Sequence, residues 1–177
     1  ASEFVSFTRE IFLSFVDIAS DRNIKYRFNS NEKTIPLWFD KNQLEKVIFN
    51  LLSNAFKFTD DGGAIHLNIE TSLNQVTLLV NDTGIGLSVK DQEKIFNRFY
   101  QVKYAHTAKN KGFGLGLSIV KEIIELHKGS VKVHSKLKEG TTFEIRLLKG
   151  NTHFNLNIDS KNTTENNTVH VLQNKIF

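Results

Sequence analysis

The fold of this chain is constrained most by two segments in which apolar and polar residues largely alternate. Residues 64–71 read AIHLNIET and residues 75–82 read QVTLLVND. A period of two is typical of β-strands that place one face on a core, and the short link between the segments indicates a hairpin. Residues 130–136 (SVKVHSK) and 141–148 (TTFEIRLL) repeat the pattern, so the sequence predicts a second hairpin near its end.

Three longer segments, at residues 3–20, 41–58 and 114–128, have the periodicity of helices. In the first, the apolar residues at helical spacing are Phe4, Phe7, Ile11, Phe15 and Ile18. Asp40 is a candidate N-cap for the second, and the Asp-Asp-Gly-Gly turn at 60–63 should end it. We expect Gly129 to cap the third helix and a further short helix within residues 88–101.

The length of 177 residues fits one domain, which we place at 1–149, followed by an Asn/Thr-rich linker or tail at 150–177. The absence of cysteine excludes disulfides, zinc–thiolate sites and cysteine catalysis. Although the net charge is +4, the lysines are scattered, so we do not expect nucleic-acid binding. The chain opens with Ala-Ser-Glu-Phe, and we expect it to be a piece of a longer protein.

The helix predicted at 41–58 has two different sides. Leucine, isoleucine and alanine gather on one, whereas Asn50, Asn54 and Lys57 follow each other at spacings of four and three on the other. This stripe is either an ordinary solvated face or a binding surface. Asparagine oxygens can ligate Mg²⁺ or hold its waters, and a lysine can meet a phosphate.

Two glycine-rich loops raise the same choice between structure and binding. Residues 81–86 read NDTGIG, in which Asp82 either caps a turn or accepts a hydrogen bond from an exocyclic amino group such as that of adenine. Residues 112–117 read GFGLGL and run into a helix, whose free N–H groups form an anion site. This spacing fits neither a Rossmann turn nor a P-loop.

Taken in chain order, these features resemble the catalytic, ATP-binding domain of sensor histidine kinases, in the superfamily of gyrase, a heat-shock chaperone and mismatch-repair ATPases. The matching motifs, all within residues 3–148, are NLLSNAFKFT, DTGIG, IFNRFY, GFGLGL and GTTF. The resemblance implies the Bergerat fold, an α/β (α+β) two-layer sandwich. In that fold a mixed, mostly antiparallel sheet packs on about three helices.

The resemblance also implies roles in binding ATP and Mg²⁺. Asp82 would bind the adenine amino group within the DTGIG loop, with Gly84 in that loop, and Gly86 and Thr142 near the base. The residues implied at the phosphates are Lys111, Gly112, Gly114, Leu115, Gly116 and Leu117.

The catalytic and metal-binding residues are implied in the same way. Asn54 would hold Mg²⁺ with Asn50 beside it, Lys57 would contact phosphate, and Arg98 would reach the γ-phosphate. Residues 101–111 would be a mobile lid that carries Lys103, Lys109 and Lys111. Phe96 and Phe99 either anchor this lid or pack in the core.

The activity class follows from what the chain lacks. Related ATPases carry glutamate where this sequence has Asn50, and an amide cannot take a proton from water. No histidine stands in the His-[Asp/Glu] context of family phosphoacceptors. The resemblance therefore implies transfer to a histidine on an upstream dimerisation hairpin. The alternatives are a serine kinase of the anti-sigma-factor type, a gyrase-like ATPase and a non-catalytic nucleotide sensor, although no motif is broken.

The resemblance extends to partners and location. The whole protein would be a membrane-anchored homodimer at the inner membrane, and this chain would be its cytoplasmic part. Its signalling partner would be a response regulator or, in a hybrid kinase, a receiver domain after the tail.

Overall fold

A computed structural model describes residues 1–102 and 113–151. In chain order the elements are β1 (Ser2–Glu3), α1 (Phe4–Leu13), α2 (Val16–Asp21), β2 (Lys25–Ser30), β3 (Pro36–Leu37), α3 (Lys41–Phe58), β4 (Ala64–Thr71), β5 (Gln75–Asp82), α4 (Val89–Gln92), α5 (Gly116–Leu126), β6 (Ser130–Lys136) and β7 (Gly140–Leu148). Both predicted hairpins, β4–β5 and β6–β7, are confirmed as antiparallel pairs.

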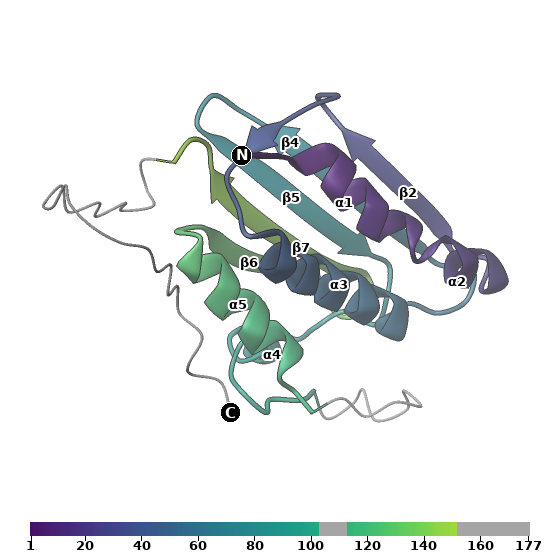
Figure 1. The fold of residues 1–177 in the computed structure, drawn as a ribbon. Coiled ribbons are helices and arrows are strands. Elements are labelled where there is room, and N and C mark those ends of the chain that lie inside the picture. The colour runs from purple at the N-terminus through teal and green to yellow at the C-terminus, as the bar shows by residue number, and fades with distance from the viewer. Residues whose placement is uncertain (103–112, 152–177) are drawn as a thin grey trace, which may run out of the picture.

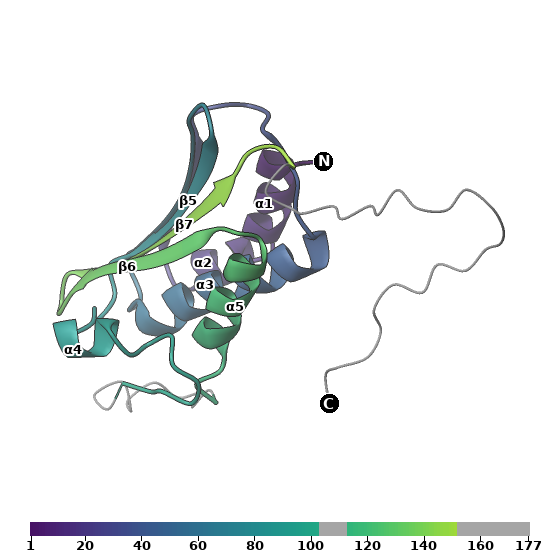
Figure 2. The same cartoon turned by 90° about the vertical axis from the view of Figure 1, so that its left-hand side faces the viewer.

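A five-stranded sheet with the order β2-β4-β5-β7-β6 forms one layer of the molecule. Only β2 and β4 pair in parallel, and the remaining neighbours are antiparallel. Helices α1, α3 and α5 form the second layer, on one face of the sheet (Figures 1 and 2). The predicted α+β sandwich is therefore confirmed. A small second sheet pairs β1 with β3.

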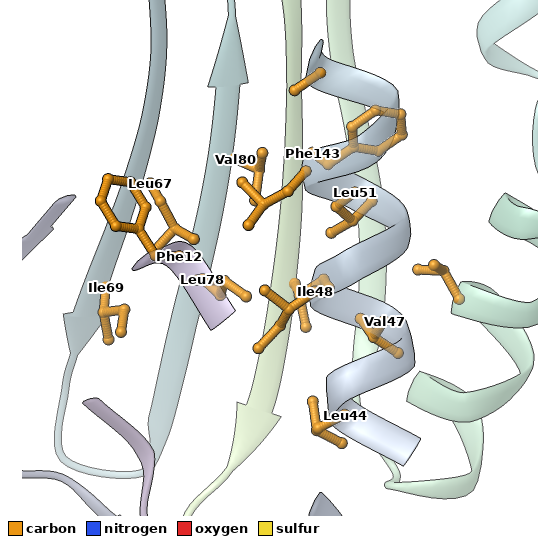
Figure 3. Packing of buried hydrophobic residues seen from close by; sticks show 14 of the residues in the cluster. Phe12, Leu44, Val47, Ile48, Leu51, Leu67, Ile69, Leu78, Val80 and Phe143 are labelled. Atoms are coloured by element: carbon orange, nitrogen blue, oxygen red, sulfur yellow. The ribbon is translucent and has the colours of Figure 1, made fainter. Parts of the chain in front are cut away.

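The core lies between the sheet and α3, because this helix buries one complete face. Its buried residues are Leu44, Val47, Ile48, Leu51, Leu52, Ala55 and Phe56. Figure 3 shows Ile48 and Leu51 directed at the strands that carry Leu78, Val80 and Phe143. The prediction of an apolar side on this helix is confirmed, and its other side is left free to face the site described below.

The first helix departs from the prediction of one continuous element. The chain breaks at Ser14 and Phe15, whose N–H groups bond to carbonyls three residues back rather than four. The break turns α2 so that Phe15 and Ala19 face the core, and Ile18 is left 46% exposed. Ile18, although it fits the apolar spacing of the segment, therefore lies on the outer side of the break.

The length of α4 and the C-terminal end of α5 also differ from the prediction. The helix expected within 88–101 extends only from Val89 to Gln92. At the end of α5 it is Lys128, not Gly129, that takes the left-handed conformation (φ 55°). The N–H groups of Lys128 and Gly129 donate to the carbonyls of Glu125 and Ile124, which is a Schellman pair. Gly129 must be small for another reason, because a Cβ there would lie 2.4 Å from the Arg146 carbonyl oxygen.

No helix in the described part of the chain has the length and apolar composition needed to cross a bilayer.

Candidate functional site

A cavity of about 930 Å³ opens beside α3, at the end of β5 and the start of α5. Most of the residues predicted for binding lie along its wall: Asn50, Asn54, Lys57, Asp82, Gly86, Gly114, Leu115, Gly116 and Leu117. These residues come from separate motifs, and the first and last of them, Asn50 and Leu117, are 67 positions apart in the sequence. The fold therefore brings together residues that the sequence only places in order. Lys111 and Gly112 lie outside the described residues.

The polar stripe of α3 forms one wall of the cavity. Asp40 caps this helix through its carboxylate, which accepts from the Gln43 N–H at 3.0 Å, as predicted. Asn50 donates its amide N–H to the Lys46 carbonyl at 2.8 Å, and its amide oxygen lies against Gly116 at the start of α5. Any Cβ at position 116 would sit 2.7 Å from that oxygen. Glycine at this position therefore lets α3 and α5 approach closely.

Asp82 ends β5 and is 5% exposed although it lines the cavity. Its carboxylate accepts from the Gly84 N–H at 2.8 Å and from the Thr141 backbone N–H. Burial raises the pKa of Asp82 from 3.8 to about 6, and these two hydrogen bonds oppose the rise. A buried carboxylate on a cavity wall can accept a hydrogen bond from a ligand without competition from bulk water.

The loop after Asp82 needs glycine for two different reasons. At Gly84 a Cβ would lie 2.3 Å from the Phe58 carbonyl oxygen, so this residue lets the loop pack on the end of α3. Gly86 has a φ of 66°, and a Cβ there would lie 1.9 Å from the Lys136 carbonyl oxygen in β6. The loop is thus held between α3 and the last hairpin.

We expect Gly86→Ala to destabilise the fold by roughly 2–4 kcal/mol, because it adds a backbone clash to an unfavourable φ. The matched control is Gly62→Ala, at a φ of 81° with no atom within 4 Å of the added methyl group. That change should cost only about 1 kcal/mol. Urea unfolding followed by circular dichroism measures both, and equal midpoints for the two variants would refute the packing argument.

The start of α5 forms the opposite wall of the cavity. Gly114 takes a φ of 71°, and its carbonyl accepts from the Phe99 N–H at 2.9 Å. Helix α5 begins two residues later, and a helix start leaves its first N–H groups without partners inside the helix. Because Leu115, Gly116 and Leu117 line the cavity, these donors are placed for an anionic ligand.

Thr142 does not reach the cavity, and this corrects the prediction by one residue. Its hydroxyl oxygen accepts from the Asn81 side chain at 2.7 Å, on the face of the sheet away from the helices. Thr141 lines the cavity instead. Successive side chains of a strand point to opposite faces, so the two threonines cannot share a role. Gly84 is also absent from the cavity wall, but its N–H holds the Asp82 carboxylate.

Arg98 lies outside the cavity wall in this structure. Its guanidinium pairs with Glu122 of α5 at 3.2 Å, and both side chains are largely exposed. The two phenylalanines of the same segment behave differently from each other. The rings of Phe96 and Phe143 pack edge-on, with their centres 6.3 Å apart. Phe99, by contrast, is 72% exposed and has a φ of 63°. Core packing therefore describes Phe96 but not Phe99.

Several cavity residues were not predicted. Ile85, Leu87 and Phe143 could have been found. Ile85 lies between the two glycines of the loop, Leu87 follows the second of them, and Phe143 alternates with Thr141 along β7. Tyr100 also lines the cavity, and its hydroxyl donates to the buried Asp91 carboxylate at 2.7 Å. Arg22 arrives from the end of α2, with no local pattern to mark it.

Of the segment predicted as a lid, only Gln101 and Val102 belong to the described residues, and both line the cavity. Residues 103–111, with their three lysines, lie outside the described part. In the described part, no group of three or more His, Cys, Asp or Glu side chains could hold a metal.

Curated proteins with known names are similar to this chain in sequence. Histidine kinase P4 of Formosa agariphila is 41% identical over 84% of this chain and 11% of its own length. Sensor protein CiaH of Streptococcus pneumoniae is 40% identical over 80% of this chain and 32% of its length. The chain thus spans no more than about a third of these curated relatives.

Among solved structures, the catalytic domain of histidine kinase ThkA superposes with a TM-score of 0.74 at 27% identity, over 84% of this chain and 97% of that domain. ThkA in complex with the response regulator protein TrrA superposes with a TM-score of 0.71 at 26% identity, over 84% and 42% of the two chains. The family described as histidine kinase-, DNA gyrase B-, and HSP90-like ATPase matches residues 39–151, from just before α3 to just after β7. The chain belongs to the histidine kinase-, DNA gyrase B- and HSP90-like ATPase family.

Proposed function

We propose that this chain is the catalytic domain of a sensor histidine kinase. It binds Mg-ATP, and the γ-phosphate passes to a histidine on a separate dimerisation hairpin. The observation that carries the proposal is the meeting, in one cavity, of the buried Asp82 carboxylate with the amide face of α3 and the N-terminus of α5. These three features suit the base, the metal and the phosphates of one nucleotide.

The base end is supported by the chemistry of Asp82. An ionised carboxylate only accepts hydrogen bonds, and the adenine amino group only donates at that edge. Two backbone N–H groups fix the orientation of this carboxylate, so it faces the cavity without reorganising. We propose Thr141, whose backbone N–H bonds the same carboxylate, as the threonine near the base in place of Thr142.

The phosphate end is supported by the opposite walls. Asn54 and Asn50 would hold a magnesium ion through their amide oxygens, because this ion prefers oxygen ligands and commonly shares them with the phosphates of a nucleotide. Bound there, the ion would neutralise charge on the phosphates. Lys57 lies in the same stripe, 5.2 Å from the centre of the Phe58 ring, and is proposed to contact phosphate. Lys111, Gly112 and Arg98 complete the proposal, and Arg98 would have to exchange Glu122 for the γ-phosphate.

Transfer to a histidine is favoured over hydrolysis by Asn50. An attacking water must lose a proton, and this amide oxygen cannot accept one at neutral pH. A histidine already has a lone pair on its imidazole nitrogen: a P–N bond forms, the bond to the bridging oxygen breaks, and ADP leaves. A serine kinase of the anti-sigma-factor type and a gyrase-like ATPase remain the alternative outcomes of the test below.

We further propose the context of this domain, residues 1–149, in its whole protein. The phosphoacceptor hairpin would precede it, the protein would be a membrane-anchored homodimer, and this domain would be cytoplasmic. The structure of ThkA with its response regulator supports a partner of that class. Residues 150–177 would link to the next part of the protein.

The test uses the chain alone with radiolabelled ATP. We expect it to bind ATP analogues with Mg²⁺ at micromolar to sub-millimolar strength, to remain unlabelled and to hydrolyse ATP barely above background. When it is joined to the upstream hairpin, label should appear on that hairpin in an acid-labile, base-stable linkage. Label on serine or threonine would instead support the serine kinase, and brisk turnover by the chain alone would support the ATPase.

A further inference from the structure

The C-terminal end of α3 is held by groups from elsewhere in the chain. A helix leaves its last carbonyls without partners inside the helix. Among the described residues, the helix end itself supplies one N–H to them, that of Thr59, which donates to the Ala55 carbonyl at 3.0 Å. The carbonyl oxygens of Phe56 and Thr59 both accept from Arg22, at 2.5 and 2.6 Å. The Nε–H of the same guanidinium donates to the Asp61 carboxylate at 2.7 Å.

Arg22 is well suited to this position. It follows the last residue of α2, and its side chain is only 31% exposed. Its positive charge interacts favourably with the negative C-terminal end of the α3 dipole. Its planar guanidinium reaches two carbonyls at once. A lysine would keep the charge but could not reproduce this two-carbonyl geometry.

Between the two carbonyls that Arg22 holds lies the one that supports the base loop. The Phe58 carbonyl accepts from the Ile85 N–H at 3.3 Å, and Gly84 packs against the same oxygen. The Gly84 N–H in turn fixes the Asp82 carboxylate at 2.8 Å. An unbroken series of contacts thus runs from Arg22 through the end of α3 and the glycine loop to Asp82.

We propose that Arg22 is a positioning residue for base recognition: by fixing the last turn of α3, it fixes the loop that aims Asp82 at adenine. This inference rests on the proposed function, since it concerns the same cavity. Arg22 acts through the Phe58 carbonyl and the loop, and it is not placed among the catalytic residues. The ion pair with Asp61, which is 75% exposed, is incidental to this role.

The test compares Arg22→Ala, Arg22→Lys and Asp61→Asn by calorimetry with Mg-ADP and Mg-GDP. Arg22→Ala should weaken ADP binding by roughly tenfold, on the scale of losing charged hydrogen bonds. It should also reduce the preference for adenine over guanine, a ratio that does not depend on the fraction of folded protein. Arg22→Lys should recover part of the loss, and Asp61→Asn should stay within about threefold of the wild type.

Amide hydrogen exchange supplies an independent readout, because the Ile85 N–H should exchange faster in Arg22→Ala than in Asp61→Asn. If Arg22→Ala does not fold, the same two readouts on Arg22→Lys decide. An unchanged base preference with unchanged Ile85 exchange overturns the inference. Wild-type protein that binds no nucleotide would instead overturn the proposed function itself.

Discussion

Asp82→Asn should lower the affinity of the chain for ATP analogues by about 10–100-fold, the largest loss expected from any single change at the base end. An asparagine has one acceptor oxygen, and the N–H groups of Gly84 and Thr141 already claim it. Its amide nitrogen would then face the amino group of adenine, so that a donor meets a donor. Calorimetry with Mg-ADP measures the loss.

The pH dependence of the same site gives a second signature. The folded pKa of Asp82, about 6, lies above its ordinary value of 3.8, so the folded state binds the proton more tightly than the unfolded state. The free energy of unfolding contributed by this group therefore rises as pH falls from about 6 to about 4. Above pH 6 the buried charge of Asp82 lowers the free energy of unfolding by on the order of 3 kcal/mol.

Asp82→Asn should accordingly bind less nucleotide yet unfold at a higher urea concentration than the wild type at pH 8. Wild-type affinity should fall as pH drops below about 6, because the protonated carboxyl presents a hydrogen to adenine, whereas the affinity of the variant should stay flat. Asp17→Asn makes the same charge change at an exposed position of α2 and should alter neither property. Wild-type affinity in Asp82→Asn would refute the base-recognition role.

The sequence predicted the parts of this molecule that depend on local pattern. The period of two in β4 and β5 reports a one-sided sheet, and the leucines of α3 report a helix with one buried face, so both elements were found. Helix ends were harder, because Lys128 takes a left-handed conformation that glycine would adopt more easily. Gly129 is needed instead where the chain lies close to the Arg146 carbonyl, and no local sequence rule contains this tertiary contact.

The site was predictable where glycine and polar residues stand out from their surroundings. Asp82, Asn54 and Gly116 are conspicuous in their segments, and the cavity brings them together. Thr142 failed because strand orientation must be known to within one residue, and a neighbouring threonine made the sequence ambiguous. Arg22 could not have been found at all, since its partners lie 34 to 39 residues away and depend on how α2 meets the end of α3.

The metal end of the cavity makes the second large prediction. Asn54→Ala should slow phosphoryl transfer to the upstream hairpin by roughly 2–3 orders of magnitude, the scale for removing one positioned group that stabilises developing charge. Charge on the phosphates changes most during transfer, so an ion that has lost a ligand fails most at that moment. Binding of ADP should weaken much less, by about threefold to tenfold, because Asp82 and the α5 N-terminus still hold the nucleotide.

The protein extended through its hairpin is the proper sample, with transfer measured in single turnover at several Mg²⁺ concentrations. Raising Mg²⁺ should recover part of the rate in Asn54→Ala, which a purely structural defect would not allow. Asn42→Ala is the matched control, because Asn42 is exposed in the first turn of the same helix, away from the cavity wall. Equal losses of transfer and ADP binding, with no response to Mg²⁺, would mean that Asn54 supports α3 rather than the ion.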